Sequence, residues 1–102
     1  MIGNRDSATF SAPLYIDAAH PALSGHFPGN PVVPGVVLLQ RVAVALKDWR
    51  DEKMTRFEVK FLAPLLPDQT AAIELRQDGA CVRFAITREV TVLARGVLEC
   101  TP

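Results

Sequence analysis

Hydrophobic residues follow two different periods along this chain, and the change of period separates one helix from a set of strands. From residue 35 to residue 50 (GVVLLQRVAVALKDWR), apolar side chains occupy almost every position around a helix. Pro34 stands where a helix tolerates a missing N–H. Met54–Leu62 instead alternates apolar and polar residues, which is typical of a half-buried strand. The pattern predicts a helix over 35–50 that is buried on several sides, followed by a strand.

Further strand-like segments lie on both sides of the helix. Asp78-Gly79 is a strong hairpin signal, whereas Arg88-Glu89 is a weaker break. Residues 17–34 are predicted as a loop and residues 1–8 as a frayed end. One helix among antiparallel strands is accommodated when the sheet curls around it, which predicts an α+β fold. The remaining predicted strands are Thr9–Asp17, Thr70–Arg76, Cys81–Arg88 and Val90–Cys100.

Length and composition narrow the possible partners. A chain of 102 residues is expected to form one domain over residues 1–102. Hydrophobic residues make up 49% of it, so burial of further surface in an oligomer is expected. Eleven basic and eleven acidic side chains leave no net charge and no basic run, which argues against nucleic acid as a partner.

The chain shows no signal for a metal, a nucleotide cofactor or a membrane. Cys81 and Cys100 lack metal-ligand and redox-motif spacing and are expected to be reduced, buried thiols. Asp17, His20 and His26 have a metal-compatible spacing, but nothing in the loop fixes their geometry, so no metal is predicted. No glycine-rich phosphate loop follows a strand. Without a secretory leader or an uninterrupted apolar run, we expect a cytoplasmic protein with no membrane span.

Residues 26–36 (HFPGNPVVPGV) are the main candidate for chemistry. His26 has an ordinary pKa of about 6.5, so it can exchange a proton near neutrality. The prolines and glycines around it restrict the backbone, and a general base needs such preorganisation. A histidine in a proline-rich loop is also compatible with a purely structural, hydrogen-bonded role.

Residues 25–36 (GHFPGNPVVPGV), which open an apolar helix, resemble the signature of the hot-dog-fold 3-hydroxyacyl-acyl-carrier-protein dehydratases. Residues 59–68 resemble that family's strand and turn after the helix, so the resemblance covers about residues 13–100. Residues 20–23 (HPAL) are similar to the short stand-alone members found in aryl polyene pathways. The resemblance implies a hot-dog dimer with two substrate tunnels at the subunit interface.

The resemblance also implies roles for individual residues. His26 would remove the C2 proton of a 3-hydroxyacyl thioester, and the backbone N–H of Gly35 would hold the thioester carbonyl. In the family, an acidic residue on the partner's helix assists departure of the hydroxyl as water. Gln40 occupies that position here, and an amide can donate a hydrogen bond or orient water but cannot deliver a proton. A structural role for Gln40, in which it satisfies a buried backbone group, stays equally open.

The substrate is expected to be an acyl chain carried on the phosphopantetheine of an acyl carrier protein or on coenzyme A, with no other cofactor. A local basic cluster would steer an acidic carrier protein, or it is simply a solvated face. The cluster comprises Arg41, Arg50, Lys53, Arg56 and Lys60. The predicted tunnel lining comprises Phe27, Pro28, Val36, Val37, Leu39 and Phe61.

The resemblance implies dehydration of 3-hydroxyacyl thioesters in fatty acid or polyene-type lipid biosynthesis, by a homodimer or by a heterodimer with a homologous hot-dog subunit. The activity is expected to be reduced or partner-dependent, because Gln40 replaces the usual acid. Two alternatives remain. A thioesterase needs a carboxylate near the thioester, and the helix supplies none before Asp48. A non-catalytic acyl-binding or partner-stabilising subunit agrees best with the missing acid at residue 40.

Overall fold

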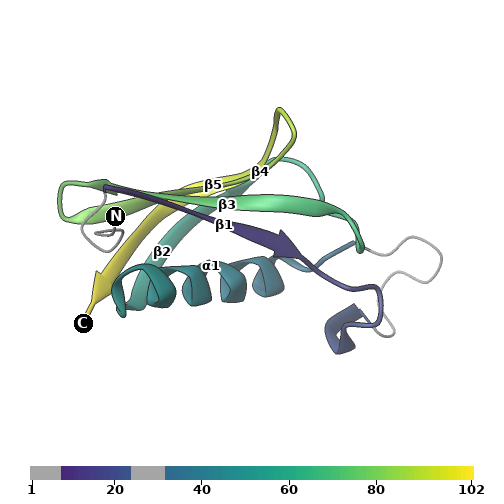
Figure 1. Ribbon diagram of the computed structural model, residues 1–102, viewed down its shortest axis with the longest axis horizontal. Helices are drawn as coiled ribbons and strands as arrows, with labels where there is room; N and C mark the ends of the chain where they lie inside the picture. Colours follow the sequence, from purple (N-terminus) through teal and green to yellow (C-terminus); the bar gives the residue numbers. More distant parts are fainter. Residues whose placement is uncertain (1–7, 24–31) are drawn as a thin grey trace, which may run out of the picture.

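The computed structural model describes residues 8–23 and 32–102, and it places one helix across a single five-stranded sheet (Figure 1). A 3-10 turn, η2, precedes the helix. The elements in chain order are β1 (Thr9–Tyr15), η2 (Pro21–Leu23), α1 (Gly35–Arg50), β2 (Lys53–Phe61), β3 (Thr70–Asp78), β4 (Cys81–Arg88) and β5 (Thr91–Thr101).

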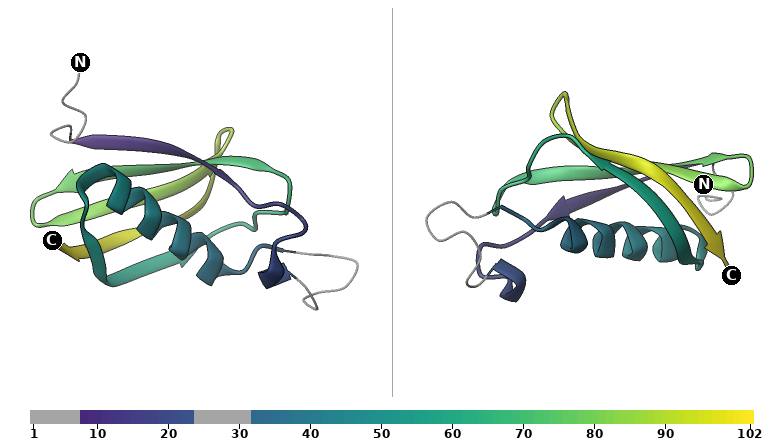
Figure 2. Two further views of the ribbon diagram at one scale, coloured as in Figure 1. Left: turned by 60° about the horizontal axis from the view of Figure 1, so that its bottom comes forward. Right: turned by 180° about the vertical axis from the view of Figure 1, so that it is seen from behind.

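All neighbouring strands are antiparallel, in the order β1-β3-β4-β5-β2, so β1 and β2 form the two edges of the sheet. Figure 2 shows that the sheet curls, with β1 on one side of α1 and β2 on the other. The helix therefore lies across the concave face, between the two edge strands. This arrangement is the α+β hot-dog fold that the sequence predicts.

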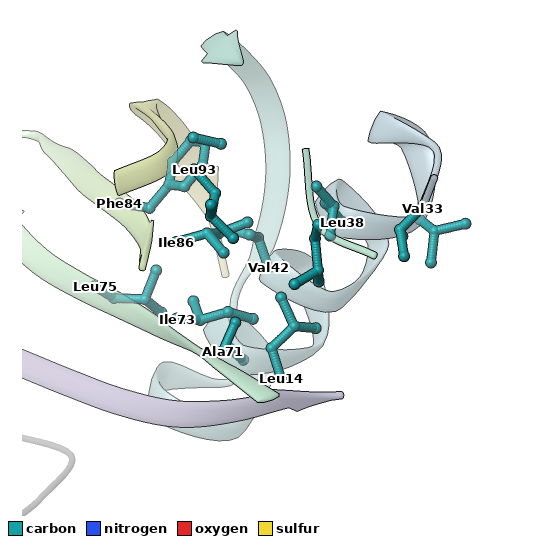
Figure 3. Close-up of a cluster of buried hydrophobic side chains, with 14 of the residues drawn as sticks. Leu14, Val33, Leu38, Val42, Ala71, Ile73, Leu75, Phe84, Ile86 and Leu93 are labelled. Atoms are coloured by element: carbon teal, nitrogen blue, oxygen red, sulfur yellow. The ribbon is translucent and has the colours of Figure 1, made fainter. Parts of the chain in front are cut away.

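The core forms between the buried side of α1 and the inward-facing residues of the sheet (Figure 3). Leu38 and Val42 point from the helix toward Ile73 and Ile86, which are paired across β3 and β4. All of the buried residues in the described ranges are apolar. Each fully buried leucine or isoleucine contributes about 1.5–3 kcal/mol, so this packing fixes how the helix sits on the sheet.

The opposite side of α1 is exposed in the single chain. Val36 and Val44 lie two turns apart on it and are 62% and 56% exposed. The sheet thus buries one side of the helix, and the burial on several sides that its apolar sequence predicts needs a further covering surface.

The two ends of α1 are capped differently. Pro34 caps the first turn without a side-chain hydrogen bond. At the other end Asp51 adopts a left-handed conformation (φ 55°), and its N–H donates to Lys47 O at 2.7 Å. Arg50 lies over the ring of Trp49 at 3.9 Å and bonds to Gln77 on β3. The carboxyl end is thereby fixed to the sheet.

The observed bounds agree with the sequence predictions closely, and the differences have local causes. The helix and the strand Cys81–Arg88 match, and the other strands differ by one or two residues at one or both ends. The first strand stops at Tyr15 rather than Asp17, because Ile16 O accepts a hydrogen bond from Asp68 N instead of a strand partner. The predicted hairpin turn has Gly79 at φ 62°. The predicted frayed end, except residue 8, lies outside the described residues.

Two further findings concern the cysteines and the membrane. Cys81 and Cys100 are free and half-buried, and burial raises the pKa of the Cys100 thiol. Within residues 8–23 and 32–102, no helix has the length and hydropathy needed to cross a bilayer.

Candidate functional site

The candidate site is built from the amino end of α1, the end of β2 and the connection that follows it. His26, Phe27 and Pro28, three of the residues that the sequence singles out, lie outside the described residues. Their roles stay predictions.

Gly35 and Phe61 meet at the start of the helix. A Cβ at residue 35 would lie 2.6 Å from Phe61 Cζ, so a side chain there would collide with the ring. Phe61 is paired with the buried Ala94 and therefore faces the helix side of the sheet. The sequence predicted both residues for the site, and the fold brings them together.

The first turn of α1 places backbone N–H groups next to this contact. The N–H groups of Val37 and Leu38 donate to Pro34 O at 3.0 and 3.4 Å. Within the described ranges, no acceptor is found for the N–H of Gly35. A free N–H at the positive end of a helix stabilises a carbonyl oxygen that gains negative charge.

An apolar hollow of about 420 Å³ lies beside Gly35 and Phe61. Besides these two it includes Leu38, which the sequence analysis left out. Part of the remaining wall comes from residues 62–65, which belong to the strand and turn (59–68) that resemble the dehydratase family. The lining residues are Val32, Val33, Gly35, Leu38, Phe61, Leu62, Ala63, Pro64 and Leu65.

Three further predicted lining residues, all of them in the described part of the chain, do not line this hollow. Val37 is part of the core, Leu39 is half-buried and Val36 is exposed. Contact of an acyl chain with any of the three stays a prediction. For Val36, it requires a second subunit that covers the open side of the helix.

Gln40 lies on the exposed side of α1, one turn from Val36 and one turn from Val44. Its exposure gives no support to the idea that it satisfies a buried backbone group. Large apolar side chains are also exposed on and after β2, next to the helix. We call the following set the open face: Val36, Val44, Phe57, Phe61 and Leu62. A polar side chain surrounded by such a surface is positioned to face a partner.

The predicted basic cluster is only partly available. Arg50 is held by Trp49 and Gln77, so its guanidinium is engaged. Its other four members are exposed on α1 and β2. Docking of a carrier protein at these four stays a prediction.

Comparisons with known proteins cover most of the chain. The family model of the ApeI-like dehydratases (ApeI dehydratase) matches residues 3–97. The 3-hydroxyacyl-[acyl-carrier-protein] dehydratase FabZ of Ehrlichia canis is 30% identical over an alignment of 82 residues that covers 68% of this chain and 50% of that protein. FabZ of Aliarcobacter butzleri is 40% identical over an alignment of 55 residues that covers 47% of this chain and 37% of that protein. The matches thus span half or less of these relatives' length.

Solved structures share the architecture at low sequence identity. A chain of the dehydratase heterocomplex ApeI:P from Xenorhabdus doucetiae superposes with a TM-score of 0.81 at 23% identity, covering 93% of this chain and 88% of that one. A 1,4-dihydroxy-2-naphthoyl-CoA thioesterase from Synechocystis superposes with a TM-score of 0.66 at 19% identity, covering 90% and 81%. Both likenesses establish the fold, and the fold alone does not separate dehydratase from thioesterase.

Proposed function

Because the chain belongs to the ApeI-like dehydratase family, we propose that it dehydrates 3-hydroxyacyl thioesters carried by an acyl carrier protein. The process it serves is fatty acid or polyene-type lipid biosynthesis in the cytoplasm. The observation that carries the proposal is the family match over residues 3–97. The donor at Gly35, beside an apolar hollow, supports it.

The proposed chemistry divides between two groups of this chain. His26 takes the proton from C2 of the substrate, and the electron pair of that bond moves toward the thioester carbonyl. The N–H of Gly35 donates to the carbonyl oxygen as negative charge develops there. The C2–C3 double bond then forms as the C3–O bond breaks, and the hydroxyl takes up a proton and leaves as water.

That last proton needs a donor, and Gln40 cannot supply one. A general acid or base contributes about 10²–10⁴ in rate, so a site with an amide there would be slow. We propose that a homologous hot-dog subunit supplies the acid across the open face. The heterocomplex among the solved relatives supports this kind of assembly for a chain of this fold.

The second candidate is a non-catalytic subunit that binds acyl chains or stabilises a partner, and Gln40 is the observation that favours it. A thioesterase is less well supported. Asp48 supplies the first carboxylate on α1, and it stands about 20 Å along the helix axis from Gly35. Attack by a directed water on a carbonyl at Gly35 requires a closer carboxylate.

One experiment separates these functions. The purified chain, alone and with a homologous acid-bearing hot-dog subunit, is incubated with 3-hydroxyacyl carrier protein. Enoyl absorbance and free thiol are followed together. Enoyl product supports the dehydratase, free thiol supports the thioesterase, and neither product with either sample supports the non-catalytic subunit.

A further inference from the structure

The sheet carries a groove of about 880 Å³ on the face that points away from α1. Its lining consists mainly of two rows of residues that are paired from strand to strand. Between the rows lie Leu75 and Phe84, which point into the core, so the rows themselves point outward. The rows, each in the order β1, β3, β4, β5, β2, are Thr9, Arg76, Arg83, Val97 and Glu58, and Ser11, Glu74, Ala85, Arg95 and Lys60. The groove therefore crosses all five strands.

Exposed basic side chains cross this groove on four neighbouring strands. We call the following set the basic stripe: Arg76, Arg83, Arg95 and Lys60. Two acidic side chains, Glu58 and Glu74, also line the groove. The groove thus has two positive charges in excess, whereas the whole chain has no net charge. A surface that concentrates positive charge in this way attracts an anionic partner.

The basic stripe consists of two pairs of like charges. Arg76 lies directly opposite Arg83, and Arg95 lies directly opposite Lys60. Like charges at directly opposite positions destabilise a sheet, because their Cβ atoms are only about 5 Å apart. Within residues 8–23 and 32–102, Arg83 forms an ion pair with Asp78, and the other three form none. An anionic group in the groove would relieve both unfavourable pairs.

The shape of the groove favours a short acidic peptide segment. Five strands spaced about 4.8 Å apart give it a length of about 19 Å, which about six residues of an extended chain cover. Glu74 on β3 and Glu58 on β2 lie toward its two ends, so they repel a longer, uniformly charged chain such as a nucleic acid strand. Ala85 and Val97 form a half-buried apolar floor between them. Apolar side chains that alternate with the acids of a peptide can pack on this floor.

We propose that the outer face of the sheet binds a short acidic segment of a partner protein along the basic stripe. The groove and the hollow beside Gly35 lie on opposite faces of the sheet, so this partner differs from the carrier protein that delivers substrate. Glu58 and Lys60 alternate along β2 with Phe57 and Phe61 of the open face. A dimer formed over the open face therefore leaves the groove accessible. The inference goes beyond the proposed function and does not depend on it.

Binding is tested with the full chain and a fluorescein-labelled peptide of six glutamates, followed by fluorescence anisotropy. We expect the affinity to fall more than about tenfold between about 50 mM and 500 mM salt, because the charges are exposed to solvent. A hexathymidylate oligonucleotide should bind at least about tenfold more weakly than the peptide. No binding at millimolar peptide, or tighter binding of the oligonucleotide, overturns the proposal.

Two variants that each reverse one charge locate the binding. Arg95→Glu changes the basic stripe, and Arg95 is not a member of the basic cluster predicted from the sequence. Lys47→Glu is the matched control, because Lys47 is exposed on α1 and pairs with Asp51. We expect Arg95→Glu to weaken peptide binding at least about tenfold and Lys47→Glu to weaken it less than about twofold. Equal weakening in the two variants overturns the proposal.

The cost of the like-charge pairs is tested separately by thermal unfolding. Arg95→Gln removes one charge of the pair with Lys60, whereas Lys47→Gln removes a charge that has an opposite partner. We expect Arg95→Gln to raise the melting temperature by about 1–8 °C at low salt, and the gain to disappear near 1 M salt. Saturating peptide should stabilise the parent more than Arg95→Gln. If Arg95→Gln gains no more than Lys47→Gln, the pair carries no cost and the proposal fails.

Discussion

Phe61 covers the first turn of α1 at Gly35, with its Cζ atom 2.6 Å from the place that a Cβ on residue 35 would take. The ring reaches this position because β2 ends there, where the N–H groups of Leu62 and Ala63 donate to Leu93 O at 2.8 and 3.1 Å. The last residue of one edge strand is thus packed against the first residue of the helix, at the N–H proposed to hold the thioester carbonyl.

We expect Gly35→Ala to fold and to lose activity. Phe61 is 49% exposed, so its ring can turn aside, and alanine is a better helix former than glycine. The new methyl group and the displaced ring would both crowd the backbone N–H of residue 35 and so hinder a thioester carbonyl from reaching it. The melting temperature should stay within a few degrees, while kcat/KM should fall more than about tenfold, towards the loss of about 10²–10³ that removal of an oxyanion-hole donor causes.

The double variant Gly35→Ala with Phe61→Ala separates the two causes of that loss. If displacement of the Phe61 ring is the main cause, the double variant should recover part of kcat/KM. If the new methyl group itself blocks the N–H of residue 35, the double variant should recover none of it. Wild-type activity in Gly35→Ala alone would exclude Gly35 from carbonyl binding.

Most of the fold could be predicted from the sequence, because local signals and burial agree. Pro34 marks the helix start, and Asp78-Gly79 marks the hairpin that Gly79 closes with φ 62°. The end of β1 could not be predicted, since it depends on a hydrogen bond to Asp68, about 50 residues away. Tertiary contacts of this kind carry no local pattern.

The candidate site was only partly predictable for a related reason. Gly35 and Phe61 stood out as parts of motifs, whereas Leu38 looked like any other core leucine of an apolar helix. The basic stripe on the outer face was not predictable, because nothing in the sequence shows that Arg76 lies opposite Arg83. Such pairs appear only when the strands are brought side by side.

Replacement of His26 by alanine should abolish turnover and leave the fold intact. An imidazole that acts as the base accounts for orders of magnitude in rate, while a loop side chain contributes little to the core. Enoyl formation and thermal unfolding are measured on the same preparation. Turnover within a few-fold of the parent would exclude the role, and a large drop in melting temperature would favour a structural histidine.

We expect the chain to form a dimer that covers the open face, because five large apolar side chains are exposed there. Phe57→Glu places a charge on that face at the edge strand and should give monomers in light scattering. Val90→Glu is the control, since Val90 is 98% exposed in the β4–β5 turn. A stable monomer of the parent at micromolar concentration would contradict the prediction and the shared tunnel with it.

The Tyr15–Asp68 contact should weaken at high pH. The hydrogen bond to Asp68, together with burial and the charges of Asp68 and Asp17, raises the pKa of Tyr15 above its ordinary value of 10.0. A raised tyrosine pKa contributes stability below that value, and the contribution is lost as the pH rises through the folded-state pKa. Urea unfolding should show the parent more stable than Tyr15→Phe at neutral pH, with a difference that shrinks as the pH rises beyond 10.0 and vanishes above the folded-state pKa. A difference that does not change with pH would contradict this assignment.

Gln40→Glu should raise the dehydration rate of the chain without a partner, because it restores a carboxyl at the proton-donor position. Burial beneath a second subunit raises the pKa of such a carboxyl, so that it carries a proton near neutrality. Lys47→Glu is the control, since it adds a carboxyl at an exposed position of the same helix outside the open face.

The same logic predicts the behaviour of a mixed dimer. His26 of this chain would face the acid of a homologous subunit and complete one site, while Gln40 would leave the reciprocal site poor. Activity per dimer should therefore be about half that of a symmetric enzyme, provided that each site works alone. Adding Gln40→Glu to the mixed dimer should then about double its rate by completing the second site. Two results together would contradict this prediction: no gain in dehydration rate from Gln40→Glu in the chain alone or in the mixed dimer, and no acid-bearing homologue recovered by co-purification. A non-catalytic acyl-binding subunit would then explain Gln40 better, because such a subunit needs no proton transfer at residue 40.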